Sequence, residues 1–424
     1  MNQVVYDAYM RILQAELVPA FGCTEPISIA LAGAKVRETL DAVPEHVFVY
    51  CSGNIVKNAK SVIVPCSGGL KGIEAAVWMG IVCGDSAKGL EVLNGATNSD
   101  IEQVKALLAG NTCSTSLLQT GAKLHIIVRG EIQDRFAEVE IRHFHDQIVR
   151  VETESGVVFT ISDEEQHAET DHDHNLLCMQ DICAFADAVN LLDIDPLISR
   201  QIEYNTRVSK EGLANRYGAN IGRALLDLYG DSVEIKARAA AAAGSDARMS
   251  GCELPVIINS GSGNQGMTVS LPVIIYAENL GVGRNKLCRA LVLSNLMAIY
   301  QKSHIGRLSA YCGAVSASAG AGAGITYLLG GTHKQICDTV TNTIADVSGV
   351  LCDGAKPSCA AKIASCIDAA ILANKLAMDG SGFNAGDGLI RSTADDTIAS
   401  IARVAREGME QTDHVILETM LRQD

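Results

Sequence analysis

Three cysteines in the C-terminal part of the chain have a spacing that could support chemistry. Cys312 precedes Gly313, and further along Cys352 and Cys359 flank a turn of glycine and proline that cannot continue a helix. Ser358 can cap the next helix, which would place Cys359 in its first turn. Thiolates beside a helix N-terminus can hold an iron–sulfur cluster, because backbone N–H groups stabilise negative sulfur there. The same pattern also suits small buried residues; it matches no standard ferredoxin run, and a zinc site would show a closer pair.

Cys23 is the second candidate, because it lies directly before a predicted helix. We expect that helix to begin with Thr24 as its N-cap, to carry Glu25 and Pro26 in its first turn, and to end near Leu40. A thiol at a helix N-terminus tends to have a lowered pKa and higher reactivity. A buried cysteine in a turn would give the same pattern.

A polar glycine-rich segment, residues 259–266, follows the strand-like residues 255–258. It contains the glycine spacing of a dinucleotide-binding loop, but that fold needs a helix next, and Pro272 is expected to interrupt it. We therefore interpret the segment as a site for a carboxylate, bound by backbone N–H groups and the Asn264 amide, or as a plain flexible loop. Its candidate binding residues are Ser260, Ser262, Gly263, Asn264 and Gln265.

Lys302, His304 and Arg307 lie shortly before Cys312. They could bind a carboxylate or move a proton. The alternative is a solvated helix end.

Two histidine pairs resemble metal sites. His143 and His145 belong to a strand-like stretch, so both side chains are expected on one face, and His172 and His174 lie in an acidic connection. Such pairs are more often polar surface than ligands, and we interpret both in that way.

The periodicity of apolar residues predicts an α+β protein with a large all-α catalytic core and a smaller mixed α/β domain. The predicted parts are helices in 1–40 that pack on the core, a mixed domain over 41–165, a polar acidic connection over 166–174, and an all-α domain over 175–424. Predicted helices span 2–17, 24–40, 71–83 and 100–109, the last capped by Ser99 with Glu102, and predicted strands span 47–51, 61–64, 123–128, 137–141 and 148–152.

The composition excludes several classes of function. The net charge is −15, from 34 basic and 49 acidic residues, which argues against binding to nucleic acid or to an anionic membrane. The N-terminal residues show no signal peptide, so we expect a cytoplasmic protein whose 14 cysteines are free thiols. The most apolar late stretch, 315–331, is short for a membrane span and is predicted to be a buried helix.

Taken together, five motifs resemble the L-cysteine desulfidase family, which is related to the alpha chain of iron–sulfur L-serine dehydratases. The resemblance covers nearly the full length and lies in residues 21–26 (FGCTEP), 52–54 (SGN), 260–266 (SGSGNQG), 305–313 (IGRLSAYCG) and 352–359.

The resemblance implies a [4Fe–4S] cluster held by Cys312, Cys352 and Cys359, with one iron left open to act as a Lewis acid. Cys23 would be the base for the α-proton or a reversible ligand of the open iron, and His304 is a less favoured base. The remaining residues implied to bind the substrate are Thr24, Glu25, Ser52, Asn54 and Lys302, together with the five residues of the polar glycine-rich segment.

The implied reaction turns a small amino acid, L-cysteine, into pyruvate, ammonia and hydrogen sulfide. Dehydration of L-serine is the nearest alternative, because the two substrates differ in one atom. A pyridoxal-phosphate lyase would need a Schiff-base lysine and a phosphate cup, neither of which is evident. A redox sensor without turnover is the alternative of another class. A homodimer is the expected assembly.

Overall fold

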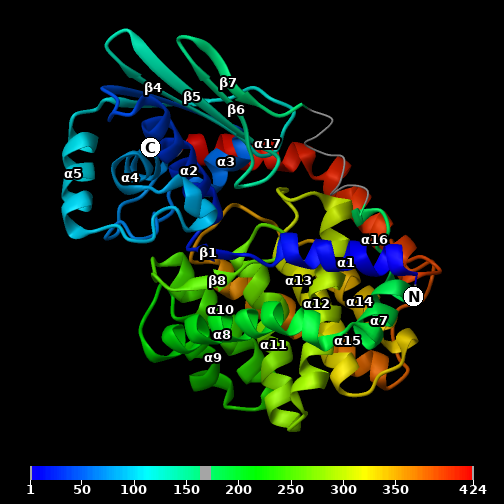
Figure 1. Cartoon of the computed structure of the whole chain (residues 1–424). Coiled ribbons are helices and arrows are strands. Elements are labelled where there is room, and N and C mark those ends of the chain that lie inside the picture. Colours follow the sequence, from blue (N-terminus) through cyan, green and yellow to red (C-terminus); the bar gives the residue numbers. More distant parts are fainter. Residues whose placement is uncertain (1, 163–172, 423–424) are drawn as a thin grey trace.

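The computed structural model describes residues 2–162 and 173–422, which form two layers (Figure 1). A mixed six-stranded sheet with helices beneath it makes up the upper layer in the figure, and a bundle of helices makes up the lower one. The predicted α+β class, with a large helical core, is confirmed. His172 and most of the predicted connection over 166–174 lie outside the described residues.

The sheet has the strand order β3-β2-β4-β5-β6-β7. Strands β2 and β3 run parallel, and the other neighbouring pairs are antiparallel. Buried and less buried residues alternate along β5, as expected for a strand with one face on a core. The strands are β2 (His46–Cys51), β3 (Cys113–Leu117), β4 (His125–Ile132), β5 (Arg135–Arg142), β6 (Ile148–Thr153) and β7 (Gly156–Thr160).

Four of the predicted strands correspond to β2, β4, β5 and β6, but the prediction for 61–64 is wrong. That segment is a loop in which Ile63 forms an isolated bridge with Lys71. It does not join the sheet because β3, which the sequence pattern does not predict, takes the place beside β2.

Helices α2 (Thr24–Leu40), α3 (Gly53–Ala59) and α4 (Ile73–Cys83) pack beneath the sheet (Figure 1). Helix α2 packs chiefly on β4, β5 and α4, and reaches the helical core with its first residues, whereas α1 (Gln3–Glu16) contacts the core at α12. The last helix, α17 (Glu410–Leu421), crosses back to pack on α3.

The predicted helix near 100–109 is α5 (Asn98–Ala109), but its cap differs from the prediction. The capping box is formed by Thr97 and Asp100, not by Ser99 and Glu102, because Thr97 is the residue with the extended backbone of an N-cap. A short 3₁₀ helix (Ser86–Glu91) precedes it.

The chain after residue 175 is almost wholly helical, as predicted. Its helix α13 (Gly313–Leu328) lies in the centre of the bundle, with contacts to α11, α12, α14 and α15, and nearly all of its residues are buried. The helices are α7 (Met179–Ala188), α8 (Leu191–Ala214), α9 (Ile221–Tyr229), α10 (Val233–Met249), α11 (Gly263–Leu280), α12 (Arg284–Ile305), α13, α14 (His333–Val347), α15 (Cys359–Met378) and α16 (Ala394–Arg403), followed by a π-helical turn (Val404–Gly408).

The small residues of α13 let its neighbours approach closely. A Cβ atom on Gly320 would lie 2.5 Å from the backbone oxygen of Ser294 on α12, well inside contact distance. The buried helix predicted for 315–331 is therefore confirmed. Among the described residues we find no helix with the length and apolar character needed to cross a bilayer.

We expect Gly320→Ala to destabilise the protein, because the added methyl group forces α12 and α13 apart. Overpacking of this kind costs about 1–3 kcal/mol, partly offset by the better helix propensity of alanine. Thermal unfolding would show a lower Tm. The matched control is Gly283→Ala, where a Cβ atom would meet nothing within 4 Å; equal Tm values for both variants would contradict the packing argument.

Helix α11 runs through Pro272, so the interruption expected at this proline is absent. Proline removes only one N–H donor from the helix, and α11 continues on both sides of it. The glycine-rich segment therefore does lead into a helix. The segment is nevertheless not part of a dinucleotide-binding fold, which requires a parallel βαβ unit. Within the described residues, β8 (Pro255–Ile257) and β1 (Pro19–Phe21) form an antiparallel two-stranded ribbon.

Candidate active site

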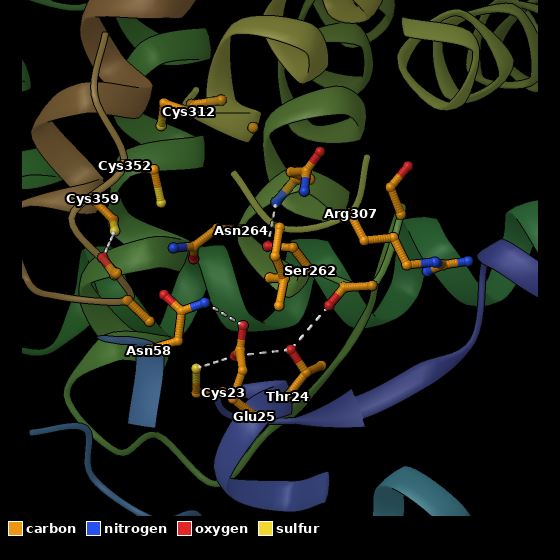
Figure 2. A pocket seen from close by; sticks show the side chains of 18 of the residues that line it. Cys23, Thr24, Glu25, Asn58, Ser262, Asn264, Arg307, Cys312, Cys352 and Cys359 are labelled. Carbon is orange, nitrogen blue, oxygen red and sulfur yellow. Dashed lines mark hydrogen bonds between the residues drawn. The ribbon is translucent and has the colours of Figure 1, made fainter. Parts of the chain in front are cut away.

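A cavity of about 100 Å³ lies where the two layers meet, and most of the predicted site residues line it. Figure 2 shows Cys312, Cys352 and Cys359 together on one side of the cavity, with Cys23 and Glu25 on the opposite side. Thr24 lies beside Glu25, and Ser262 and Asn264 lie between the two groups. The cavity is thus bordered by segments that are far apart in the sequence.

The β1–β8 ribbon brings the first two of these segments together. Pro19 pairs with Ile257 and Phe21 with Pro255, so the ribbon joins the segment that leads into α2 to the segment that leads into α11. The Thr24 hydroxyl then donates a hydrogen bond of 2.9 Å to the Gly261 carbonyl. Thr24 is the first residue of α2, and Cys23 is the N-cap, which corrects the predicted cap by one residue.

A second pairing brings two of the cysteines together. Tyr311 and Leu351 form an isolated antiparallel bridge, in which the Cys312 amide donates to the Val350 carbonyl at 3.1 Å and the Cys352 amide to the Ala310 carbonyl at 2.7 Å. Cys312 is the N-cap of α13.

The third cysteine, Cys359, is the first residue of α15, where the Lys356 amide reaches its sulfur at 3.5 Å. Ser358 occupies the N-cap position as predicted, but its side chain makes no capping hydrogen bond because its backbone is already helical.

The three thiols suit an iron–sulfur cluster better than a single ion. Among the described residues, no three His, Cys, Asp or Glu side chains converge on one point as ligands of a lone metal would. A cluster binds each thiolate through a different iron, so it needs the thiols spread around one side of a cavity. Burial and the neighbouring Cys352 raise the pKa of Cys312. Ionised thiols here therefore need a cation, and iron would supply it.

Glu25 is the anionic centre of the opposite side. Its Oε1 accepts a 2.9 Å hydrogen bond from the Asn58 amide, and His145 Nε2 lies 3.8 Å away. Burial raises the pKa of Glu25, but the nearby His145 ring and the hydrogen bond from the Cys23 thiol outweigh burial and lower the pKa to about 2. A carboxylate is therefore present in the cavity at neutral pH.

The pKa of Cys23 is raised, which is opposite to the sequence expectation. The cause is first the burial of the thiol and second the negative charge of Glu25, and the thiol donates to Glu25 Oε2 at 3.0 Å. These two effects exceed the stabilisation that a helix N-terminus gives to a thiolate.

Arg248, at the end of α10, is a cavity residue that the motifs do not reveal. It is 5% exposed, and its Nε has no hydrogen-bond partner among the described residues. Burial raises the pKa of both Cys23 and Cys359, and the charge of Arg248 opposes this rise at both thiols, so the guanidinium lies near each of them. A Cβ atom on Gly263 would lie 2.4 Å from Arg248 Nε, so only glycine lets this cation sit against the N-terminus of α11.

His145 also lines the cavity, and its interpretation as polar surface is wrong. It is 4% exposed, because the loop after β5 turns inward, with a positive φ of 68° at His143, and places the ring beside Glu25. Asn58 of α3 is the other cavity residue that the motifs do not indicate.

The structure places most of the predicted binding residues in the cavity: Thr24, Glu25, Ser260, Ser262, Asn264, Gln265 and Lys302, with Gly263 at the start of α11 beside them. Burial lowers the pKa of Lys302 to about 8. His304, Ser52 and Asn54 do not line it. His304 lines a neighbouring pocket and packs edge-on against Tyr300, while Ser52 and Asn54 line another cavity, because α3 turns its first residues away from the cysteines.

Arg307 borders the cavity and is paired with Glu16 at the end of α1, at 2.5 Å. Burial raises the pKa of Glu16, but the Arg307 charge and a hydrogen bond with His174 outweigh it, so the pKa falls below the usual 4.5. His174, which we interpreted as surface, thus contacts a buried carboxylate at 3.6 Å.

This pair gives a pH-dependent prediction. Since the pKa of Glu16 is lower in the folded state, its contribution to stability is present above pH 4.5 and is lost as pH falls through the folded pKa. We expect wild type to have a higher Tm than Glu16→Gln at pH 7, and the difference to shrink at pH values below 4.5. A Tm difference that is constant with pH would contradict this assignment.

Comparison with known proteins shows the family of this chain. The family model for the serine dehydratase alpha chain matches residues 87–418. The chain belongs to this family. It is also 56% identical to a UPF0597 protein of Lachnoclostridium phytofermentans, over 98% of this chain and all of the relative. UPF0597 proteins of Desulfitobacterium hafniense and Treponema denticola are 48% and 46% identical, over 97% or more of each chain.

Membership of the serine dehydratase alpha-chain family indicates a lyase of the dehydratase type. The predicted relationship to that alpha chain is confirmed. The matched range contains Arg248 and all three cysteines of the cluster candidate, but it begins after Cys23 and Glu25. The roles of the residues on both sides of the cavity rest on the geometry of the site.

Proposed function

We propose that this protein is an iron–sulfur lyase that converts L-cysteine into pyruvate, ammonia and hydrogen sulfide. The observation that carries the proposal is one small cavity that is lined by three cysteines, a buried carboxylate and a buried arginine. An amino acid needs an anion for its ammonium group and a cation for its carboxylate, and the cavity offers both.

The substrate carboxylate would bind at Arg248 and the N-terminus of α11. The first N–H groups of a helix have no partner inside the helix, and the dipole of α11 favours an anion there. The substrate ammonium would bind at Glu25, whose low pKa keeps it ionised. These two contacts would direct the β-carbon and its sulfur towards the three cysteines.

The α-proton is assigned to the Cys23 thiolate. Burial and the charge of Glu25 keep this thiol protonated in the empty cavity, so it would have to release its proton to solvent first, and a substrate ammonium group at Glu25 would favour that release. Because its thiol is hydrogen-bonded to Glu25, Cys23 would lie beside the carbon that carries the ammonium group. A cluster held by Cys312, Cys352 and Cys359 would supply a Lewis acid for the β-substituent. Loss of the α-proton and of sulfide leaves aminoacrylate, and its hydrolysis by one water gives pyruvate and ammonia.

L-Serine is the second candidate substrate, because the matching family is described by serine dehydratase. The same contacts at Arg248 and Glu25 would hold its carboxylate and ammonium groups. Hydroxide would then leave in place of sulfide.

The test is an assay of anaerobically reconstituted protein with L-cysteine and L-serine side by side. For a [4Fe–4S] cluster we expect about four irons per chain and a broad absorption band at roughly 400 nm. We also expect faster pyruvate release from cysteine than from serine. Faster release from serine would favour the dehydratase. If iron-free protein still made pyruvate, the proposed role of the cluster would be wrong. If the cluster were intact but no small amino acid were turned over, the proposal that the protein is a lyase would be wrong.

A further inference from the structure

A second cavity, of about 330 Å³, lies between α3, the β3–β4 connection and α17. It shares no lining residue with the cysteine cavity. Its wall includes Ser52 and Asn54, which belong to a motif that the proposed reaction does not use. The side chains of Leu117, Leu417 and Leu421 supply an apolar part of the wall.

The lining of this cavity holds three carboxylates, two lysines and His414, and two of its buried oxygens are acceptors without a donor among the described residues. Asn54 and Asp413 are 9% and 7% exposed, and Asn54 Oδ1 and Asp413 Oδ2 are buried without a hydrogen-bond partner among the described residues. Buried oxygens of this kind are costly unless a donor reaches them. Glu410 and Glu418 add exposed carboxylates to the same lining, and Lys123 makes only a 4.0 Å contact with Glu410.

Lys57 connects this cavity to the cysteine segment. Its ammonium group is 1% exposed and donates to Asp413 Oδ1 at 2.6 Å and to the backbone carbonyl of Cys352 at 3.3 Å. Asp413 therefore accepts a hydrogen bond from Lys57 with Oδ1, and Lys57 also contacts the Cys352 carbonyl. Its second oxygen, Oδ2, has no hydrogen-bond partner among the described residues. A ligand that hydrogen-bonds the second oxygen would alter the first contact.

We propose that the second cavity binds a small molecule with a protonated amine, held by Asn54, Asp413 and the acidic rim, and that binding is transmitted through Lys57 to the Cys352 segment. The volume and the apolar wall favour a short aliphatic body, and the excess of acceptors favours an ammonium group over an anion. Binding of the amine does not depend on the proposed reaction. The interpretation that this binding regulates the enzyme rests on the proposed function.

The experiment is hydrogen–deuterium exchange of the full chain with ethanolamine as the probe. Ethanolamine carries an ammonium group but no carboxylate, so it lacks the group that Arg248 would bind. We expect saturable slowing of exchange in 117–123, in α17 and at Leu351–Asp353. At a concentration of 100 times Kd, the slowing can reach about a hundredfold for amides that exchange only from the free form.

The variants distinguish this cavity from the cysteine cavity. Asn54→Leu should lose the protection, and Glu410→Gln, on a side chain that is 61% exposed and thus safe for folding, should weaken binding several-fold. Arg248→Met should keep the protection by ethanolamine, because Arg248 does not line the second cavity. Absence of saturable protection in α17, or protection there without any change at Leu351–Asp353, would overturn the proposal. Because exchange is measured without turnover, this result is independent of whether the chain is a lyase.

Discussion

A Cys312→Ser protein, purified and reconstituted without oxygen, is expected to lose its cluster and most of its pyruvate production. A bound metal supplies several kcal/mol of transition-state stabilisation, so we expect a fall in kcat/KM of about a thousandfold or more. Iron content and the visible spectrum should fall together with activity. The loss should be large because Cys312 is held by the bridge to the Cys352 segment and lies on the side of the cavity with the other two thiols.

The control for this variant is Cys337→Ser. Cys337 is a partly buried free thiol on α14 that does not line the cavity, so its loss should leave iron content and turnover unchanged. If Cys312→Ser retained both its cluster and full activity, the assignment of the three cysteines would be wrong.

Arg248→Met should weaken substrate binding without removing iron. A hydrogen bond to a charged group contributes about 1.5–3 kcal/mol, which corresponds to a rise in KM of about 10- to 150-fold. Methionine keeps much of the volume, so the fold should survive. Arg248→Lys should recover part of the affinity, because it restores the charge but not the planar pair of donors.

The matched control is Arg238→Met on the same helix. Arg238 is paired with Asp368 and does not line the cavity, so its removal should leave KM unchanged. A normal KM in Arg248→Met, or an equal rise in both variants, would show that Arg248 does not bind the substrate carboxylate.

The sequence predicts the parts of this site that depend on local structure. Cys312 and Cys359 lie at helix N-termini, where turn and cap residues mark the boundary, and the glycine-rich segment ends at the start of α11. The central helix α13 is predictable because an uninterrupted run of small apolar residues can only be buried. Each of these features depends on residues that are close together in the chain.

The rest of the site depends on tertiary packing and could not be predicted in this way. His145 follows a strand whose continuation would have left it on the surface, and a single left-handed residue, His143, reverses that direction. Asn54 lies only four residues before Asn58 on α3, yet the two line different cavities. Arg248 did have a signal, because it follows a stretch of mostly small residues, 239–247, that is typical of a buried helix, and a charged residue there needs a buried partner or a ligand.

The return of α17 to the α/β layer has a consequence for how the protein is made. Strand β2 and helix α3 are synthesised early, but the carboxylate that neutralises buried Lys57 comes from Asp413, near the end of the chain. An emerging N-terminal half therefore holds an unpaired cation that its folded form would bury, which is unfavourable. We expect the α/β layer to finish folding only after α17 has left the ribosome.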